Sequence, residues 1–279
     1  MSSKSKTPET EQPVKKRRRG IYLLPNLFTT AALFCGFYAI VASMSDRFEE
    51  AGIAIFVAMV LDGLDGRVAR LTNTQSDFGK EYDSLSDMLS FGVAPALVMY
   101  QWGFEGLADY GWLWAKLGWI GAFFFTGCAA LRLARFNVRV GVVDKRFFQG
   151  LPSPMAAAVV AGAVWVGARL GIEGGMLAIP AFFLTVTAGA LMVSNISYYS
   201  FKDFSLTRRV RFTTILPILL IFVAIATNPP GVLFVMALTF TASGPIISLI
   251  RWRRRRLQRA DDVPGSEAAD DETEDSDAS

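Results

Sequence analysis

Residues 60–90 read VLDGLDGRVARLTNTQSDFGKEYDSLSDMLS, a stretch that joins two apolar segments through a short polar connection. Asp62 and Asp65 are three residues apart and therefore share one face of a helix. Asp83 and Asp87 are four residues apart and share a face of the next helix. The stretch predicts a helical hairpin whose two helices bring four carboxylates to the same end.

The rest of the chain is strongly apolar. Of its 279 residues, 52% are apolar and 19% are charged, and the mean hydropathy is +0.35. Soluble domains carry about 25% charged residues, whereas a helix crosses a bilayer with about 20 apolar ones. We expect an all-α fold, a polytopic membrane helical bundle with about eight transmembrane helices. They are predicted at 21–44, 51–71, 84–102, 112–133, 154–171, 175–195, 211–228 and 231–250.

Loop charges predict the orientation of the bundle. Of the 28 Lys and Arg residues, all except Arg47, Lys116 and Arg169 fall on the side that both termini would share. Positive charge marks the cytoplasmic side, so we expect both termini and the loop of the hairpin to be cytoplasmic.

Three regions follow from this pattern. We expect residues 1–20 to form a basic disordered tail, 21–250 to form the transmembrane domain, and 251–279 to be a basic anchor followed by an acidic disordered tail. The basic clusters at 15–19 and 251–256 anchor the topology, and they could also attract anionic lipid headgroups. Nucleic-acid binding is not favoured.

The composition excludes several kinds of chemistry. The chain has no histidine, which rules out a histidine general base, a Ser-His triad and a His-ligated zinc site. Its two cysteines, Cys35 and Cys128, lie in separate apolar segments and offer neither a disulfide framework nor a CxxC metal site. A metal would need oxygen ligands, which suits Mg²⁺ or Mn²⁺.

The four aspartates are the candidate site. Carboxylates in or beside membrane helices usually mark function, and four at close range would repel one another without cations between them. Two divalent cations bound between the carboxylates would offset that repulsion, and two-metal sites commonly act on phosphate esters. The alternative is a solvated helix-end network with Arg67, Arg70 and Lys80. We keep that interpretation for Asp77 and Glu81, which fall off the spacing.

The full pattern is Asp62-x2-Asp65-Gly66-x2-Ala69-Arg70-x8-Gly79-x3-Asp83-x3-Asp87. It resembles the signature of the CDP-alcohol phosphatidyltransferase family, whose members transfer a phosphatidyl or related group from a CDP-linked donor to an alcohol and release CMP. The resemblance implies that two divalent cations, Mg²⁺ or Mn²⁺, are bound by Asp62, Asp65 and Asp83. It implies that Asp87 completes a metal site and is the catalytic general base.

The resemblance also implies a pocket for the CDP lipid. Gly66, Ala69, Arg70 and Gly79 would line the cytidine and pyrophosphate part of it. Small residues let a phosphate approach the backbone, and an arginine can contact phosphate oxygens bidentately. In the segment LPNLFTT at 24–30, Asn26 and Thr29 would lie near the nucleotide; the alternative is a plain helix start after Pro25.

Three further segments resemble the membrane-embedded phosphatidylserine synthase branch of the family: RLARFNV at 132–138, FFQGLPSP at 147–154 and LMVSNISYYSFKDF at 191–204. Serine carries a carboxylate and an ammonium group, so its pocket needs a cation and acceptors. The candidates for serine binding are Arg132, Arg135, Asn137 and Lys202. The alternative for these cations is positive-inside anchoring.

The branch implies transfer of a phosphatidyl group from CDP-diacylglycerol to the hydroxyl of L-serine. It also implies a homodimer in the bacterial cytoplasmic (inner) membrane, with the active site facing the cytoplasm. Other acceptors stay open: glycerol 3-phosphate, an inositol phosphate, or choline, for which Phe136, Tyr198 and Tyr199 could supply aromatic contacts. A cation transporter that uses the Asp cluster is a different class, but no inverted repeat supports it.

Overall fold

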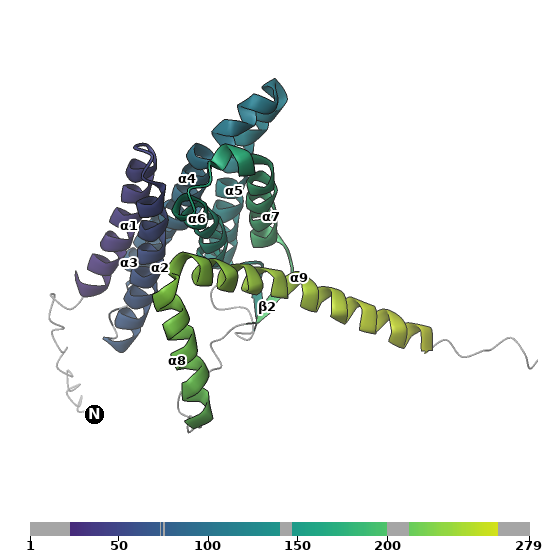
Figure 1. Ribbon diagram of the computed structural model, residues 1–279. Helices are drawn as coiled ribbons and strands as arrows, with labels where there is room; N and C mark the ends of the chain where they lie inside the picture. The colour runs from purple at the N-terminus through teal and green to yellow at the C-terminus, as the bar shows by residue number, and fades with distance from the viewer. Residues whose placement is uncertain (1–22, 73, 75, 140–146, 200–211, 262–279) are drawn as a thin grey trace, which may run out of the picture.

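A computed structural model describes residues 23–72, 74, 76–139, 147–199 and 212–261 (Figure 1). Its α-helices are α1 (Leu23–Ser43), α2 (Phe48–Leu71), α3 (Asp77–Asp87), α4 (Ala94–Trp102), α5 (Trp112–Arg139), α6 (Ser153–Arg169), α7 (Ala178–Val193), α8 (Phe212–Thr227) and α9 (Pro229–Asp261). A π-helix, η2 (Met88–Val93), joins α3 to α4. Two 3-10 segments, η3 (Phe104–Tyr110) and η4 (Gly174–Leu177), precede α5 and α7.

The predicted all-α fold is confirmed, because helix occupies each of the eight predicted segments. The sequence did not predict a short strand pair that the described residues contain. Strands β1 (Phe147–Gln149) and β2 (Ser197–Tyr199) run antiparallel, with Phe147 opposite Tyr199. They bring together two of the segments on which the branch resemblance rests.

Four stretches of helix are long and apolar enough to cross a bilayer: Pro25–Ser43, Trp112–Val138, Gly174–Val193 and Pro229–Ile250. The shorter helix Ser153–Arg169 is apolar as well. The chain is therefore an integral membrane protein. The number of spans and the side of each terminus stay predictions, and residues 1–20 and 262–279 lie outside the described part of the chain.

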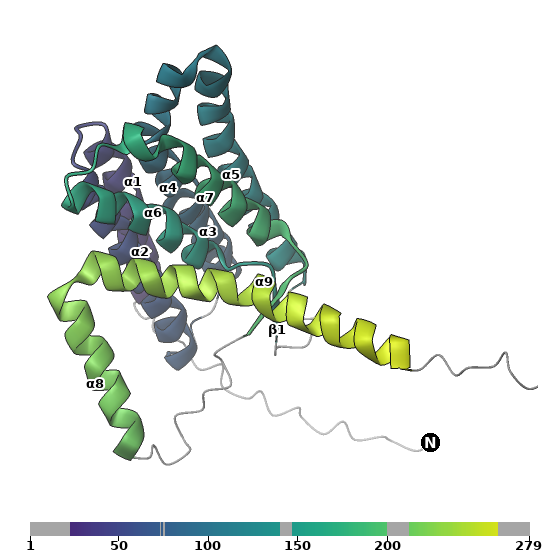
Figure 2. The same ribbon diagram turned by 45° about the vertical axis from the view of Figure 1, so that its right-hand side comes forward.

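The helices α1 to α7 form a bundle, and α9 runs across it rather than along it (Figures 1 and 2). The contact between α9 and α6 is close: a Cβ on Gly162 of α6 would lie 3.1 Å from the ring of Phe234 of α9. Ala158, Val159 and Ala237 are buried in the same cluster. Small side chains allow this approach, as in other packed membrane helices.

The hairpin predicted from residues 60–90 is present, but its second helix begins earlier than expected, at Asp77. The reason is a cap: the Ser76 hydroxyl accepts a hydrogen bond from the Gly79 N–H at 3.0 Å. After Asp87 the chain continues into the π-helix η2, an irregularity that often accompanies functional sites.

Helix α1 supports this hairpin through direct backbone contacts. The hydroxyl of Ser86 donates to the Thr29 carbonyl and that of Ser90 to the Ala32 carbonyl, both at 3.1 Å. Gly36 makes the approach possible, because a Cβ there would lie 2.6 Å from Ser90 Oγ and 2.8 Å from Ser90 Cα.

We therefore expect Gly36→Ala to lower the melting temperature of the purified protein. Helix propensity alone favours alanine by about 1 kcal/mol, but overpacking against a backbone atom costs about 1–3 kcal/mol. Gly127→Ala in α5 is the matched control, because nothing lies within 4 Å of its added Cβ. A melting temperature of Gly36→Ala at or above that of Gly127→Ala would contradict the close packing of α1 on η2.

Candidate active site

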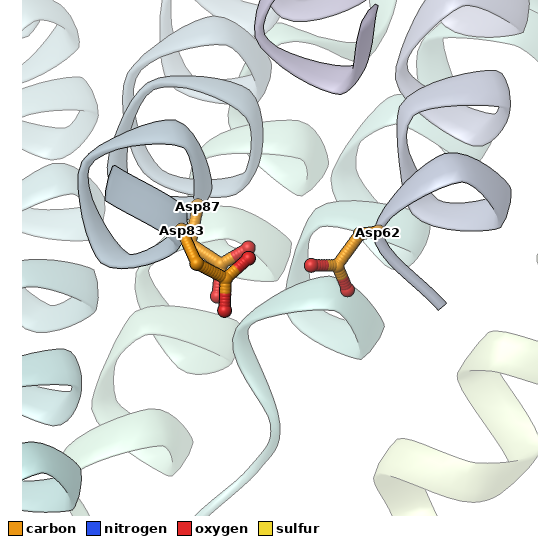
Figure 3. Close-up of side chains that lie close together, drawn as sticks. All are labelled: Asp62, Asp83 and Asp87. Atoms are coloured by element: carbon orange, nitrogen blue, oxygen red, sulfur yellow. The ribbon is translucent and has the colours of Figure 1, made fainter. Parts of the chain in front are cut away.

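Three of the four predicted carboxylates come together at one end of the hairpin. Asp62, near the end of α2, faces Asp83 and Asp87, which stand side by side on α3 (Figure 3). One oxygen from each carboxylate lies within 4.8 Å of the other two. Each of the three is partly buried rather than fully exposed.

This geometry follows from the local sequence. The i, i+4 spacing puts Asp83 and Asp87 on one face of α3, and the short connection turns that face toward the last turns of α2. Two ion pairs among the described residues, Arg47–Glu50 and Arg169–Glu49, involve the other end of α2. The aspartate cluster is therefore at the opposite end of α2 from the two glutamates that form ion pairs, Glu49 and Glu50.

Asp65 stands beside the three and is held differently. It is only 5% exposed, and its Oδ2 accepts a hydrogen bond from the Thr29 hydroxyl at 2.7 Å. It is still close enough to Asp83 for the two charges to repel each other. The fourth predicted ligand therefore lies next to the cluster with one of its oxygens tied to α1.

The residues fit divalent cations. Every donor in the group is a carboxylate oxygen, the ligand that Mg²⁺ and Mn²⁺ prefer. Asp83 Oδ1 is buried without a hydrogen-bond partner among the described residues, and a buried unpaired acceptor is costly unless something binds it. No other group of three or more acidic or cysteine side chains in the described residues is arranged to hold a metal.

The residues predicted to bind the CDP lipid lie on α1, α2 and α3, the helices that carry or support the cluster. A Cβ on Gly66 would meet no atom within 4 Å, so no other part of the described residues covers this position of α2. A Cβ on Gly79 would lie 3.3 Å from Asn26 Oδ1, which places Asn26 of α1 beside the start of α3. Arg70 is exposed and its Nε donates to the Gly66 carbonyl at 2.8 Å, while Ala69 is half-buried.

Two of the predicted serine ligands lie near the aspartates. The guanidinium of Arg132 donates to Ser153 Oγ at 2.6 Å and is attracted by the Asp87 carboxylate. The amide of Asn137 donates to Ser84 Oγ at 3.0 Å, and Ser84 lies on α3 between Asp83 and Asp87. The last turns of α5 therefore border the carboxylate cluster.

Arg135 is bound by three protein acceptors. It donates to Gln149 Oε1 at 2.6 Å, to Asn195 Oδ1 at 2.7 Å and to the Val193 carbonyl at 3.2 Å. It connects the end of α5 to β1 and to the end of α7. The remaining candidate, Lys202, lies outside the described residues.

Sequence reasoning did not identify the side chains that hold these candidates. Ser153, Ser84, Gln149 and Asn195 each accept a hydrogen bond from a predicted site residue. Three of them lie within the branch-like segments at 147–154 and 191–204, so those segments were the available signal. Their partners are distant in sequence, and no spacing rule connects them.

The chain matches one known protein family over more than half of its length. The sequence pattern of the CDP-alcohol phosphatidyltransferase family matches residues 22–195, which contain all of the aspartates above.

Three relatives carry the same name, CDP-diacylglycerol–serine O-phosphatidyltransferase. The protein from Helicobacter pylori is 38% identical over 204 residues, 73% of this chain and 83% of its own length. That from Mycobacterium bovis is 31% identical over 258 residues, 88% of this chain and 86% of its own. That from Methanocaldococcus jannaschii is 40% identical over 149 residues, 53% of this chain and 63% of its own. The carboxylate hairpin and these matches together show that the chain is an enzyme of the CDP-alcohol phosphatidyltransferase family.

Proposed function

We propose that the protein transfers the phosphatidyl group of CDP-diacylglycerol to the hydroxyl of L-serine and releases CMP. The observation that carries the proposal is the carboxylate cluster of Asp62, Asp83 and Asp87, which the last turn of α5 reaches through the hydrogen bond from Asn137 to Ser84. Arg132 on the same helix, oriented by Ser153, supplies a cation that can bind the carboxylate of an amino-acid acceptor. The names of the relatives support serine as that acceptor.

The cluster Asp62, Asp83 and Asp87, with Asp65 beside it, would hold two divalent cations, Mg²⁺ or Mn²⁺. When bound, such cations stabilise the negative charge that develops on a pyrophosphate as its P–O bond breaks. The protein contributes the rigid framework, because both carboxylate-bearing helices pack against α1.

In this proposal Asp87 removes the proton of the serine hydroxyl. The serine oxygen forms a bond with the phosphorus that carries diacylglycerol, and the bond from that phosphorus to the bridging oxygen of CMP breaks. The products are phosphatidylserine and the CMP anion, and the proton stays on Asp87 until solvent takes it. A general base of this kind contributes about 10²- to 10⁴-fold to the rate.

Arg132 would bind the serine carboxylate, since an arginine matches a carboxylate with two parallel N–H groups. Ser153 accepts from one of its nitrogens at 2.6 Å and fixes the orientation of the guanidinium. Asn137, held by Ser84 at the side of α3, would add an amide donor or acceptor for the same substrate. Lys202 stays a further candidate cation.

The donor would keep its acyl chains in the bilayer while its CDP head enters the open face at Gly66, with Asn26, Ala69, Arg70 and Gly79 around it. We propose that this end of the bundle faces the cytoplasm of a bacterial cell, with the protein in the inner membrane as a homodimer. The positive-inside distribution of the loops supports the orientation.

The proposal is tested with purified protein, CDP-diacylglycerol, Mn²⁺ and isotopically labelled L-serine. The expected result is label in a lipid with the mass of phosphatidylserine and one CMP released per lipid formed. CMP release without labelled lipid would remove serine as the acceptor. Neither product from folded protein would reject the transferase reaction and favour an ion-binding role for the aspartates.

Arg135 is the second arginine among the candidates for serine binding. If it binds serine, Arg135→Ala should raise the KM for serine about tenfold and the KM for CDP-diacylglycerol much less. The reason is that a charge-assisted hydrogen bond contributes about 1.5–3 kcal/mol. Steady-state kinetics with each substrate varied in turn measure the difference.

Asn195→Ala is the control, because it removes one acceptor of Arg135 and leaves the guanidinium in place. Direct binding predicts a smaller effect from Asn195→Ala than from Arg135→Ala. Equal increases of both KM values in Arg135→Ala would show that Arg135 connects α5, β1 and α7 structurally and does not bind serine.

A further inference from the structure

Thr29 of α1 lies at the junction of the two helices that carry the aspartates. It is 4% exposed, and its hydroxyl is within 2.7 Å of Asp65 Oδ2 on α2. Its backbone carbonyl accepts from the Ser86 hydroxyl of α3 at 3.1 Å. One residue of α1 therefore touches the carboxylate of α2 and the residue that precedes Asp87 on α3.

The hydroxyl has one proton and two acceptors within reach, Asp65 Oδ2 at 2.7 Å and the Pro25 carbonyl at 3.2 Å. The shorter contact goes to a carboxylate, and hydrogen bonds to charged acceptors are about twice as strong as those between neutral groups. The proton is therefore directed to Asp65. That proton is therefore not available to a nucleotide, although the family resemblance implies that Thr29 lies near one.

The bond has a consequence for Asp65. This carboxylate is buried, and the negative charge of Asp62 repels it. A hydrogen bond to Oδ2 therefore stabilises the charge of Asp65 and also restricts the rotation of its carboxylate. With Oδ2 held by α1, the other oxygen is the one left for a cation. Partners of metal ligands commonly act in this way, and their loss costs about 10- to 100-fold in metal affinity.

We infer that Thr29 is a positioning residue for the metal site, which it serves by orienting Asp65. The inference rests on the metal site of the proposed function. It is independent of the identity of the acceptor alcohol.

The experiment is a titration of the full-length purified protein in lipid nanodiscs with Mn²⁺ alone, with free Mn²⁺ measured by electron paramagnetic resonance. Thr29→Val keeps the shape of the side chain and removes the donor, and it should weaken Mn²⁺ binding by about 10- to 100-fold. Thr29→Ser restores the donor and should bind within about threefold of the unchanged protein.

Thr185→Val is the matched control, because Thr185 is also buried but its hydroxyl donates only to the Ala181 carbonyl of its own helix. It should leave Mn²⁺ affinity unchanged. If Thr29→Val does not fold, Thr29→Ala with the same Thr29→Ser comparison provides the test.

Unchanged Mn²⁺ affinity in Thr29→Val would overturn the inference. So would a raised KM for CDP-diacylglycerol at saturating Mn²⁺ with normal Mn²⁺ affinity, since that result assigns Thr29 to the lipid. Neither result bears on the proposed transfer of the phosphatidyl group to serine, which the assay with labelled serine tests separately. Failure of the unchanged protein to bind Mn²⁺ would instead reject the metal site and this inference together.

Discussion

Asp87→Asn is expected to lower the turnover number by about 10³-fold, within the range assigned to a general base. Asparagine has nearly the shape of aspartate, so the α3 face that carries residues 83 and 87 should keep its geometry. The amide cannot accept the proton of the attacking hydroxyl, and it also removes one negative charge from the cluster with Asp62 and Asp83. Binding of CDP-diacylglycerol should survive in large part, because the nucleotide end is assigned to other residues.

The control for this substitution is Asp77→Asn. Asp77 lies on the same helix, in its exposed first turn, and is off the spacing of the cluster. It should keep near-normal turnover. The measurement is single-turnover formation of lipid product at saturating donor, with donor binding measured alongside. Turnover in Asp87→Asn equal to that in Asp77→Asn would remove Asp87 from the role of base.

Removal of divalent cations is expected to reduce turnover to the uncatalysed background. Without cations, Asp62, Asp83 and Asp87 hold carboxylate oxygens within 4.8 Å of one another, an arrangement that their mutual repulsion opposes. Mn²⁺ or Mg²⁺ added after chelation with EDTA should restore the rate. The same cations should raise the melting temperature, because a ligand that binds only the folded state stabilises it by mass action.

Both effects should disappear together in Asp62→Asn or Asp83→Asn and persist in Asp77→Asn. The variants separate loss of a specific site from a general effect of cations on the membrane or detergent. Undiminished turnover in metal-free buffer, with chelation verified by metal analysis, would contradict the two-metal assignment.

The sequence predicted the elements that depend on local rules. Helix occupies each of the eight segments predicted from hydropathy, and the spacing within Asp62–Asp65 and Asp83–Asp87 predicted the faces that meet in the structure. These features follow from the helical repeat and from the length of a bilayer span. The boundaries were less accurate: the Ser76 cap moves the start of α3 to Asp77, ahead of the apolar segment.

The sequence did not predict contacts between residues that are far apart along the chain. The bond from Thr29 to Asp65 spans 36 positions, and those from Arg135 reach Gln149 and Asn195 on other elements. Such pairs depend on how the helices pack, which no spacing within one helix determines. The β1–β2 pair was missed for the same reason, since each strand has only three residues and exists through its partner.

The path of α9 shows a further limit. Its apolar first part predicted a membrane span like the others, but it runs across the bundle against α6 and continues as helix to Asp261 (Figure 2). Composition predicts that such a segment is apolar and helical. It does not predict the direction, which goes with close packing of Phe234 on Gly162 and of Gly244 on Tyr198.

The proposed transfer of the phosphatidyl group to serine is tested with a panel of acceptor alcohols. Purified protein with CDP-diacylglycerol and Mn²⁺ is offered L-serine, glycerol 3-phosphate, an inositol phosphate or choline in separate reactions, and each lipid product is identified by mass. Phosphatidylserine is expected from the first reaction and no new lipid from the other three. A different phospholipid, with none from serine, would contradict the proposed transfer.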